Sequence, residues 1–215
     1  MEIINKYIFK KIVNLKSVSD SNIDFLPVLN KKFYFENFYR DYKKILQDKS
    51  IDVVLILTSM SVHSKIAKEA LLSGKHVLVE KPMATNMKEL NELMKIAKSS
   101  KKMLIPAPFV ILSPTYQAID QELKKNNIGK VSLARARYGW AGPNWGEWYY
   151  KTGGGPLFDL GVYNITTLTG LLGPVKSIYA KSSLSSKYRK INKKNLKVKT
   201  DDKFQIILNF KSGCI

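Results

Sequence analysis

The sequence is poor in the residues that cross-link a chain or bind metals. Cys214 is the only cysteine among 215 residues, so neither a disulfide framework nor a cysteine-based zinc site can form within one chain. The only two histidines, His63 and His76, fall on different predicted elements. These shortages argue against a metal enzyme, and we expect no metal site.

Long apolar runs are also missing. No segment approaches the roughly 20 consecutive apolar residues that span a membrane, and residues 1–16 alternate charged with apolar residues instead of forming a signal-peptide core. We therefore expect a cytoplasmic protein with no membrane partner. The hydrophobic content of 45% is ordinary for one large or two small globular domains.

Arginine is scarce although the formal net charge is +19, a charge that invites a nucleic-acid partner. Bidentate contacts with phosphates and base edges favour arginine. Of the 36 basic residues only four are arginine, and the lysines are spread along the whole chain. We therefore expect no nucleic-acid partner, and we interpret the densest basic run, residues 187–199, as a solvated loop or strand edge.

Strands and helices alternate in the first half. Apolar runs predict strands at residues 15–19, 51–57, 76–79 and 103–105. Helical spacing of apolar residues predicts helices at residues 38–48, from Ser61 to Gly74, and after Thr85 or Asn86. This alternation indicates right-handed βαβ crossovers and a doubly wound parallel sheet in residues 1–107.

The pattern changes after Pro106. Ser113 and Pro114 predict the start of a helix that runs to about residue 126, and residues 157–172 predict another. Alternating or apolar runs predict strands at residues 131–138, 175–180 and 204–210. Residues 108–215 therefore indicate an α+β domain with a mostly antiparallel sheet. Its loop at residues 140–156 is rich in Gly, Trp and Tyr, which suits the lining of a site and equally a contact with a partner subunit.

The tripeptide Glu80-Lys81-Pro82 ends the predicted strand at residues 76–79. Ligands collect at the carboxyl ends of strands in open α/β sheets, so this lysine can face a substrate. The proline restricts the backbone at Lys81 and helps to aim its side chain. Taken alone, the tripeptide favours the simpler interpretation of an exposed lysine in a turn.

An ordered set of motifs runs along the chain. It comprises residues 52–58 (DVVLILT), 61–63 (SVH), 74–82 (GKHVLVEKP), 113–114 (SP) and 153–163 (GGGPLFDLGVY). Together these motifs resemble the Gfo/Idh/MocA oxidoreductases, the family of glucose-fructose oxidoreductase, inositol dehydrogenase and related sugar dehydrogenases. The resemblance extends from about residue 6 to the end of the chain, and it is the combination of motifs that makes it specific.

The resemblance implies an N-terminal Rossmann domain that binds NAD or NADP and a C-terminal domain that holds the substrate. It implies that Lys81 hydrogen-bonds the reacting hydroxyl and the nicotinamide, and that Asp159 is the acidic residue of the substrate motif. Tyr163 stands where many members carry a catalytic histidine; a branch with glucose-fructose oxidoreductase and the dihydrodiol dehydrogenases has tyrosine there. Asp20 matches the position that meets the adenosine ribose.

Five residues are expected to line one cleft at the strand ends and to contact the cofactor, namely Asp20, Thr58, His63, Glu80 and Lys81. A carboxylate on the ribose diol repels a 2′-phosphate, which favours NAD over NADP. Other interpretations remain open: Asp20 as a turn residue, His63 as a solvated side chain, and Tyr163 as a core aromatic on the helix at residues 157–172.

The sequence also departs from the family pattern. No Gly-x-Gly-x-x-Gly loop precedes Asp20, and residues 1–14 resemble the tail of the first Rossmann helix. We therefore expect a chain truncated at both ends, starting after the phosphate loop and stopping within the second domain. Thr58-Ser59-Met60 replaces the usual Thr-Pro-Asn.

Hydride transfer from an alcohol requires a base near the hydroxyl and a cation to stabilise the oxygen. Lys81 and Tyr163, with Asp159 four residues before the tyrosine, suit these tasks. We therefore expect an NAD(P)-dependent dehydrogenase of a sugar, polyol or related alcohol, which in full length forms a homo-oligomer through its C-terminal sheet. The alternative is a truncated, non-catalytic relative that binds a ligand or another subunit.

Overall fold

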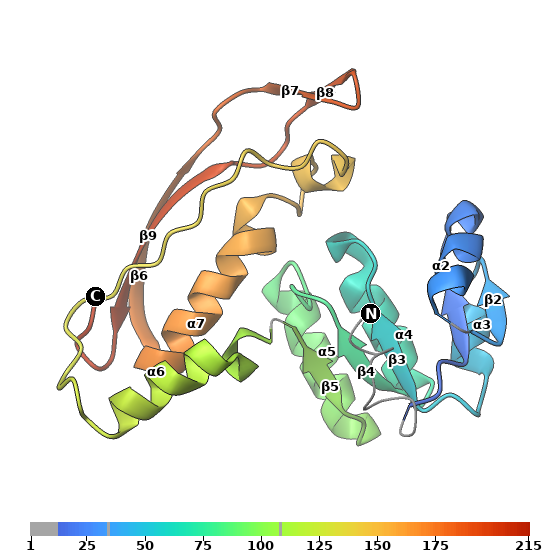
Figure 1. Ribbon diagram of the computed structural model, residues 1–215, viewed down its shortest axis with the longest axis horizontal. Helices are drawn as coiled ribbons and strands as arrows, with labels where there is room; N and C mark the ends of the chain where they lie inside the picture. Colours follow the sequence, from blue (N-terminus) through green and yellow to red (C-terminus); the bar gives the residue numbers. More distant parts are fainter. Residues whose placement is uncertain (1–12, 34, 108) are drawn as a thin grey trace.

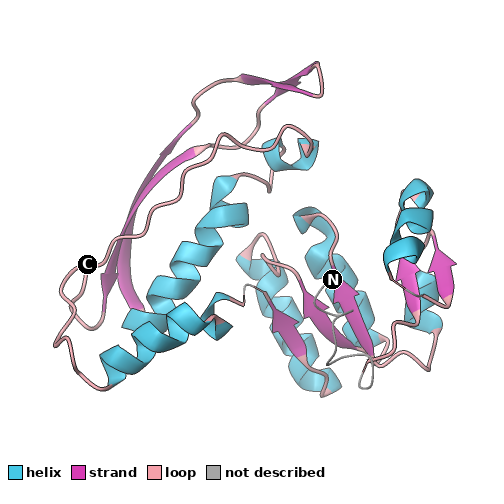
Figure 2. Cartoon of the chain, in the orientation of Figure 1, coloured by secondary structure: helices cyan, strands magenta, loops and turns pink. Residues whose placement is uncertain are grey.

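The computed structural model describes residues 13–33, 35–107 and 109–215, which form an α/β part followed by an α+β part (Figures 1 and 2). The helices of the first part are η2 (Ile23–Phe25), α2 (Leu26–Lys32), α3 (Lys43–Gln47), η3 (Met60–Val62), α4 (His63–Leu72) and α5 (Met87–Ser100). Those of the second part are η4 (Val110–Leu112), α6 (Pro114–Lys124), η5 (Glu147–Tyr150), η6 (Leu157–Gly161) and α7 (Val162–Leu172).

The first part contains two parallel sheets. Their strands are β1 (Ser17–Ser19), β2 (Asn37–Tyr39), β3 (Val53–Ile56), β4 (His76–Val79) and β5 (Leu104–Pro106). One sheet has the order β1-β2 and the other β3-β4-β5. Because all these strands are parallel, the segments that follow β3 and β4 emerge at the same edge of the sheet.

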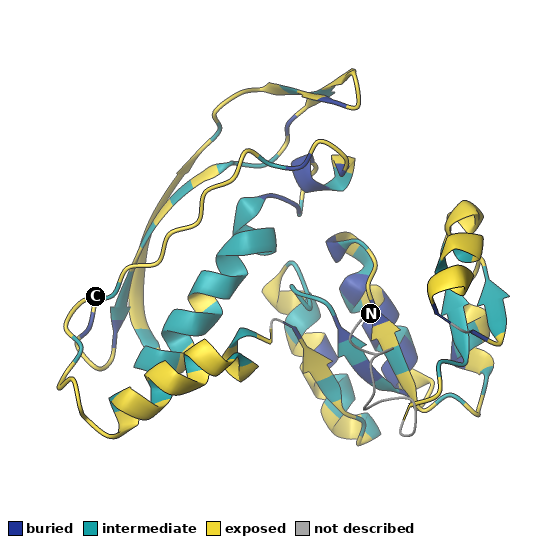
Figure 3. Ribbon diagram, in the orientation of Figure 1, coloured by how far each residue is buried: buried dark blue, intermediate teal, exposed yellow. Residues whose placement is uncertain are grey.

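The main core lies on one face of the β3-β4-β5 sheet. Val77 and Val79 on β4 are each 1% exposed and pack with buried residues of α4 and α5, including Leu71 and Leu93. Figure 3 shows this concentration of buried residues around α4 and β4. Asn86 accepts a hydrogen bond from the Glu89 N–H and caps α5, so a local signal starts the helix that covers this core.

The second part is built on antiparallel strands and the two α-helices α6 and α7. Its strands are β6 (Val175–Ser183), β7 (Tyr188–Ile191), β8 (Lys194–Lys197) and β9 (Lys203–Phe210). β6 pairs with β9, and β7 forms a hairpin with β8. The predicted fold class, a parallel Rossmann-like part followed by an α+β part with antiparallel strands, is confirmed. Among the described residues, no helix is both long and apolar enough to cross a membrane.

Two predicted elements differ from the structure, and a third, the basic run expected as a solvated loop or strand edge, is seen in more detail. Phe38 and Tyr39 were expected in a helix but lie in β2, because their aromatic side chains suit a strand and β1 offers a partner. Residues 131–138 form no ladder; Ser132 and Ala134 share backbone hydrogen bonds with Ile215 alone. The basic run at residues 187–199 contains the β7–β8 hairpin, whose turn residues Asn192 and Lys193 both have positive φ.

Candidate functional site

Lys81 lies directly beyond the carboxyl end of β4. The Glu80 N–H donates to the carbonyl of Ile56 at the end of β3, which continues the parallel ladder up to the site. The Glu80 carboxylate accepts a hydrogen bond from the backbone N–H of Lys81 at 3.0 Å. The Lys81–Pro82 peptide bond is cis. The end of the sheet and the Glu80 carboxylate thus hold the backbone from which the lysine side chain extends.

Asp159 lies in η6, a single turn of π-helix that leads into α7. Short π-helical turns occur frequently at functional sites. Gly154 precedes this turn and packs so tightly that a Cβ would lie 2.5 Å from the carbonyl oxygen of Trp148. The Asp159 N–H donates to the carbonyl of Gly155, whose φ is +93°. The glycine run therefore lets the chain turn closely against η5 and present Asp159.

The two parts of the chain meet through Lys81. Its Nζ lies 2.5 Å from Oδ1 of Asp159 and 2.5 Å from the carbonyl oxygen of the same residue. The two side chains are only 10% and 19% exposed. The same ammonium lies 5.0 Å from the ring centroid of Tyr163, one turn further along α7. The structure thus brings together the three residues predicted to be catalytic, whose roles remain predictions.

His63 holds two loops of the site together. The ring is 1% exposed, with Nδ1 2.9 Å from the carbonyl oxygen of Pro82 and Nε2 2.9 Å from that of Thr58. With both nitrogens engaged and the ring enclosed, the imidazole is not the solvated side chain considered above, and it has no nitrogen free for a cofactor. The ring can act on the site by positioning the two loops.

The other predicted cofactor residues lie at strand ends. Asp20 follows β1, where its N–H donates to the carbonyl of Tyr39 and its Oδ1 accepts from the N–H of Asn22. Thr58 follows β3, and its side chain is exposed. Asp20 lies beyond the β1-β2 sheet, whereas Thr58 and Lys81 lie beyond the β3-β4-β5 sheet. No described hydrogen bond or ion pair connects Asp20 with Lys81 or Thr58. Their contacts with a cofactor stay predictions.

Tyr149 is a buried tyrosine that the sequence prediction named only as part of an aromatic loop. Asp159 is near enough for its negative charge to act on the phenol; burial, chiefly, and then this charge raise the pKa of Tyr149 above its ordinary value. Its ring packs edge-on against the rings of Trp140, Trp148 and Tyr150. The only sequence signal was the richness of residues 140–156 in aromatic side chains, several of which the structure packs on one another within the chain.

A pocket of about 160 Å³ opens between the two parts of the chain. One wall is formed by residues 59–61, in the turn after β3, and the other by Trp148 and residues 151–154, including Lys151 and Thr152. The first wall follows Thr58 along the chain and the second precedes Asp159, but Lys81, Asp159 and Tyr163 are not among the lining residues. The pocket presents hydroxyl groups, one ammonium and one indole.

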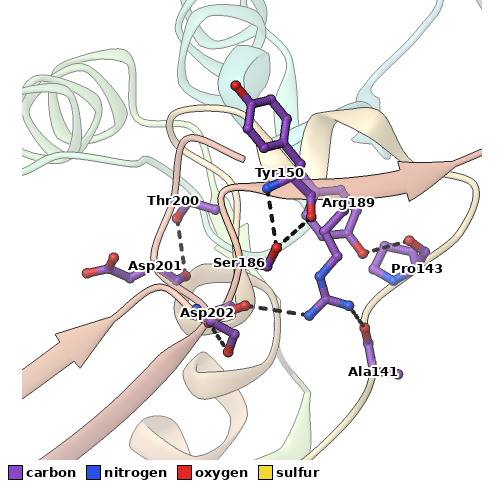
Figure 4. Close-up of polar contacts among 10 residues, drawn as sticks. Ala141, Pro143, Tyr150, Ser186, Arg189, Thr200, Asp201 and Asp202 are labelled. Carbon is purple, nitrogen blue, oxygen red and sulfur yellow. Dashed lines mark hydrogen bonds and ion pairs between the residues drawn. The ribbon is translucent and has the colours of Figure 1, made fainter. Parts of the chain in front are cut away.

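Arg189, on the β7–β8 hairpin, contacts the aromatic loop at residues 140–156. Figure 4 shows Arg189 between the carbonyl of Ala141, to which it donates at 2.7 Å, and the carboxylate of Asp202 at 3.5 Å. The guanidinium lies 6.0 Å from the ring centroid of Tyr150, whose hydroxyl donates to the carbonyl of Pro143. The hairpin β7–β8 therefore anchors the loop that forms one wall of the pocket.

Comparisons with known proteins identify the relatives of this chain. The family model described as the oxidoreductase family with an NAD-binding Rossmann fold matches residues 5–107, and the GFO/IDH/MocA C-terminal domain matches residues 116–215. A trans-1,2-dihydrobenzene-1,2-diol dehydrogenase of Mus musculus is 31% identical over 68% of this chain and 44% of its own length. Myo-inositol 2-dehydrogenase of Thermotoga maritima is 22% identical over 94% of this chain and 59% of its own.

Solved structures give the same result. The crystal structure of levoglucosan dehydrogenase in complex with NADH and levoglucosan superposes with a TM-score of 0.81 at 25% identity, covering 93% of this chain and 55% of that one. The chain thus spans about half the length of the relatives it matches. The two family models together cover nearly all of it, in the order expected for the two domains. The chain belongs to the Gfo/Idh/MocA family of NAD-binding oxidoreductases.

Proposed function

We propose that the whole protein is an NAD-dependent dehydrogenase that oxidises a hydroxyl group of a sugar, polyol or related alcohol. The observation that carries this proposal is the meeting of Lys81, Asp159 and Tyr163 beyond the carboxyl end of β4. An ammonium, a carboxylate and a phenol at the ligand edge of a parallel sheet supply the charge and proton chemistry that alcohol oxidation needs.

Lys81 is suited to hold the reacting oxygen. An ammonium has three N–H donors, and two of them are directed at Oδ1 and the carbonyl oxygen of Asp159. The third remains for a substrate oxygen, whose negative charge grows as its proton leaves. Asp159 therefore orients the lysine while Lys81 stabilises the oxygen, in a site where low exposure strengthens the interaction.

Tyr163 is suited to take part in removing the proton of the reacting hydroxyl. Its hydroxyl has no hydrogen-bond partner among the described residues, although its ring lies beside the Lys81 ammonium. The phenol is therefore free to meet the same substrate hydroxyl and to take part in removing its proton. Two groups then converge on one oxygen, as the resemblance implied.

The described residues fit the two ends of NAD, which when bound would supply the hydride acceptor. Asp20 commits only Oδ1 to the backbone, so Oδ2 remains for the adenosine ribose and favours NAD over NADP. Thr58, Glu80 and Lys81 lie at the ends of β3 and β4, where a nicotinamide would face the substrate. No glycine precedes Gly74, so these residues offer no glycine-rich backbone cradle for the pyrophosphate, and we expect this chain alone to bind NAD weakly.

The substrate class rests on the site and on the relatives. The relatives are named for a dihydrodiol, for myo-inositol and for levoglucosan, all of which carry several hydroxyl groups. The pocket between the two parts of the chain offers Ser59, Ser61 and Thr152 as hydroxyl partners and Trp148 as an apolar wall. Such a mixture suits a compact polyhydroxylated ring.

The experiment is a turnover assay on the longest in-frame form, with NAD or NADP and a panel of sugars and cyclic polyols, following NADH absorbance. We expect NAD-linked oxidation of at least one polyol, abolished in Lys81→Met and retained in Lys95→Met, an exposed lysine on α5. If polyols bind without turnover, the second candidate, a non-catalytic ligand-binding relative, replaces the first. That candidate is favoured by the missing pyrophosphate cradle.

We further propose a division at residue 107 into a partial dinucleotide-binding domain and a partial substrate-binding domain, and a homo-oligomer that uses the β6–β9 sheet. Tyr179 and Ile207 are directly opposite each other on this sheet and are 67% and 48% exposed. A paired apolar patch of this kind suits a contact with a second copy. Sedimentation of the full-length protein and of Tyr179→Lys would test it, and a parent that remains monomeric would exclude it.

A further inference from the structure

We propose that the pocket between the two parts of the chain binds a phosphate group of the substrate, with Lys151 as its charged partner. This inference rests on the proposed function, because it narrows the polyhydroxylated substrate to a phosphorylated sugar or polyol. The hydroxyls of Ser59, Ser61 and Thr152 then bind the phosphate end of that substrate.

The lining of the pocket suits an anion. It consists of Ser59, Met60, Ser61, Trp148, Lys151, Thr152, Gly153 and Gly154. Every polar side chain in this set can donate a hydrogen bond, and the ammonium alone has three donors. None of the lining residues is acidic, so no carboxylate of the lining repels an anion. A phosphate group with three acceptor oxygens and a charge of about −1.5 to −2 at pH 7 matches one ammonium surrounded by hydroxyls.

The hydroxyls of the pocket are not used by the protein itself. Those of Ser59, Ser61 and Thr152 have no hydrogen-bond partner among the described residues. Ser61 and Thr152 are exposed, and Ser59 is half-buried. All three can therefore turn toward a ligand without breaking a contact within the fold.

Lys151 is available as well, although it has one partner. Its Nζ lies 3.5 Å from Oε2 of Glu147, and the two side chains are 59% and 47% exposed. Exposed ion pairs contribute little free energy, and Glu147 does not line the pocket. Moving the ammonium from this carboxylate to a phosphate therefore costs little.

The backbone that carries Lys151 is already ordered. The Lys151 N–H donates to the carbonyl of Trp148 at 3.2 Å, and the Lys151 carbonyl accepts the N–H of Gly154 at 2.9 Å. A Cβ on Gly154 would lie 2.5 Å from the carbonyl oxygen of Trp148, so the segment packs closely on itself. A preformed turn of this kind spares a ligand the cost of ordering the loop.

The first wall of the pocket leads to Lys81 through one histidine. Ser59 follows Thr58, whose carbonyl oxygen lies 2.9 Å from Nε2 of His63. The other nitrogen of this ring lies 2.9 Å from the carbonyl oxygen of Pro82, the residue after Lys81. The turn after β3 and the loop of the catalytic lysine are thus held at a fixed separation.

The second wall leads to Lys81 through the glycine run. Gly154 precedes Gly155, whose carbonyl accepts the N–H of Asp159, and Asp159 pairs with Lys81. Because Lys81, Asp159 and Tyr163 do not line the pocket, the group bound there is not the reacting hydroxyl. A phosphate on another atom of the same substrate fits this arrangement.

The composition of the walls assigns the phosphate to the substrate and not to NAD. Five of the eight lining residues belong to the second part of the chain, which matches the C-terminal domain of the family. None of the proposed cofactor residues Asp20, Thr58 and Glu80 is among them. The pyrophosphate of a dinucleotide would instead lie along the strand ends of the first part.

The test measures binding to this chain by calorimetry. The probes are inorganic phosphate and two matched pairs, glucose 6-phosphate with glucose and myo-inositol 1-phosphate with myo-inositol. The variants are Lys151→Gln and Glu147→Gln. The control is Lys124→Gln, which removes an exposed lysine from a comparable pair with Asp120, four residues earlier on α6.

We expect the parent and Lys124→Gln to bind at least one phosphorylated probe about tenfold or more tightly than its neutral counterpart. Lys151→Gln should lose roughly tenfold to a hundredfold of the phosphate affinity, the worth of a hydrogen bond to a charged group. Glu147→Gln should bind the phosphorylated probe about two- to fivefold more tightly, because the competing carboxylate is gone. A loss of folding cannot produce this gain.

Equal affinity for the phosphorylated and neutral members of both pairs would overturn the inference, as would equal losses in Lys151→Gln and Lys124→Gln. Competitive displacement of the sugar phosphate by ADP-ribose would assign the pocket to the cofactor and would also overturn it. Binding that depends on Lys151, without NAD-linked oxidation of the bound sugar phosphate by the longest in-frame form, would refute the proposed activity alone. Oxidation of neutral polyols at the same rate in the parent and in Lys151→Gln would refute the inference alone.

Discussion

The Lys81 ammonium and the Asp159 carboxylate lie 2.5 Å apart although 78 positions separate them in the sequence. One belongs to the loop after a parallel strand and the other to the first turn before α7. This ion pair links the parallel-sheet part to the antiparallel part. Under the proposed function, catalysis and the docking of the two parts are therefore coupled through one pair of residues.

Lys81→Met should impair the chemical step far more than cofactor binding. Methionine keeps most of the apolar packing but removes the charge proposed to stabilise the substrate oxygen. Charge-stabilising donors in dry sites are commonly worth about 2.7 to 4 kcal/mol, or roughly a hundred- to a thousandfold in rate. Single-turnover kinetics with saturating NAD in the longest in-frame form would measure the effect. Turnover within threefold of the Lys95→Met control would show that Lys81 is not the catalytic cation.

Asp159→Asn should destabilise the fold through the loss of charge on one partner of the pair. Asparagine keeps an oxygen acceptor and the Asp159 carbonyl contact remains, so we expect a loss of about 1.5 to 3 kcal/mol, the range for a hydrogen bond to a charged group. A double-mutant cycle with Lys81→Met, measured by urea unfolding, isolates the coupling. Strict additivity of the two changes would mean that the pair contributes nothing to stability.

His63→Ala should loosen the two loops that meet at the ring. The change removes the ring nitrogens that contact the carbonyls of Thr58 and Pro82, so that at least one carbonyl loses its donor, and it opens a cavity, with an expected loss of about 2 to 4 kcal/mol. Amide exchange should rise at residues 58–61 and 81–84, while the strand β5 stays protected. His63→Gln, which can restore one donor, should recover part of the loss. Unchanged exchange in the alanine variant would exclude a positioning role.

We expect the contribution of Tyr42 to the stability of the fold to be lost at alkaline pH. Burial first, and then the hydrogen bond to Glu69 at 2.9 Å, raises the pKa of Tyr42 from 10.0 to about 12. Because the folded-state value is the higher one, the stabilisation is complete below pH 10 and is lost as the pH rises from 10 to 12. The stability difference between the parent and Tyr42→Phe, measured by urea unfolding, should therefore shrink across this window. A constant difference would contradict the raised pKa.

Arg189→Lys should make the aromatic loop at residues 140–150 more mobile without unfolding the β7–β8 hairpin. Lysine keeps a positive charge but lacks the planar fork that reaches both the Ala141 carbonyl and Asp202 (Figure 4). We expect faster amide exchange at residues 140–150. Equal exchange in the parent and the variant would show that the aromatic packing alone holds this loop.

Much of the fold was predictable because its signals are local. Strand β4 has the predicted bounds, Asn86 and Ser113 cap α5 and α6 as expected, and Lys81 follows β4 at the ligand edge. Side-chain periodicity, helix caps and proline positions act over a few residues and can be read directly from the chain. The expectation of a helix at Phe38 and Tyr39 was wrong because their partner, β1, lies about 20 residues earlier.

The amino-acid order was thus sufficient for most of the element types, the parallel sheet and the position of Lys81 at its edge. The packing of distant segments was needed to place the Lys81 ammonium on Asp159, to aim both His63 nitrogens at loop carbonyls and to pack the Tyr149 ring within an aromatic cluster. Local propensity depends on neighbours along the chain, whereas these contacts depend on how two separately formed parts dock. Their geometry follows from close packing across the whole molecule, which no short stretch of sequence encodes.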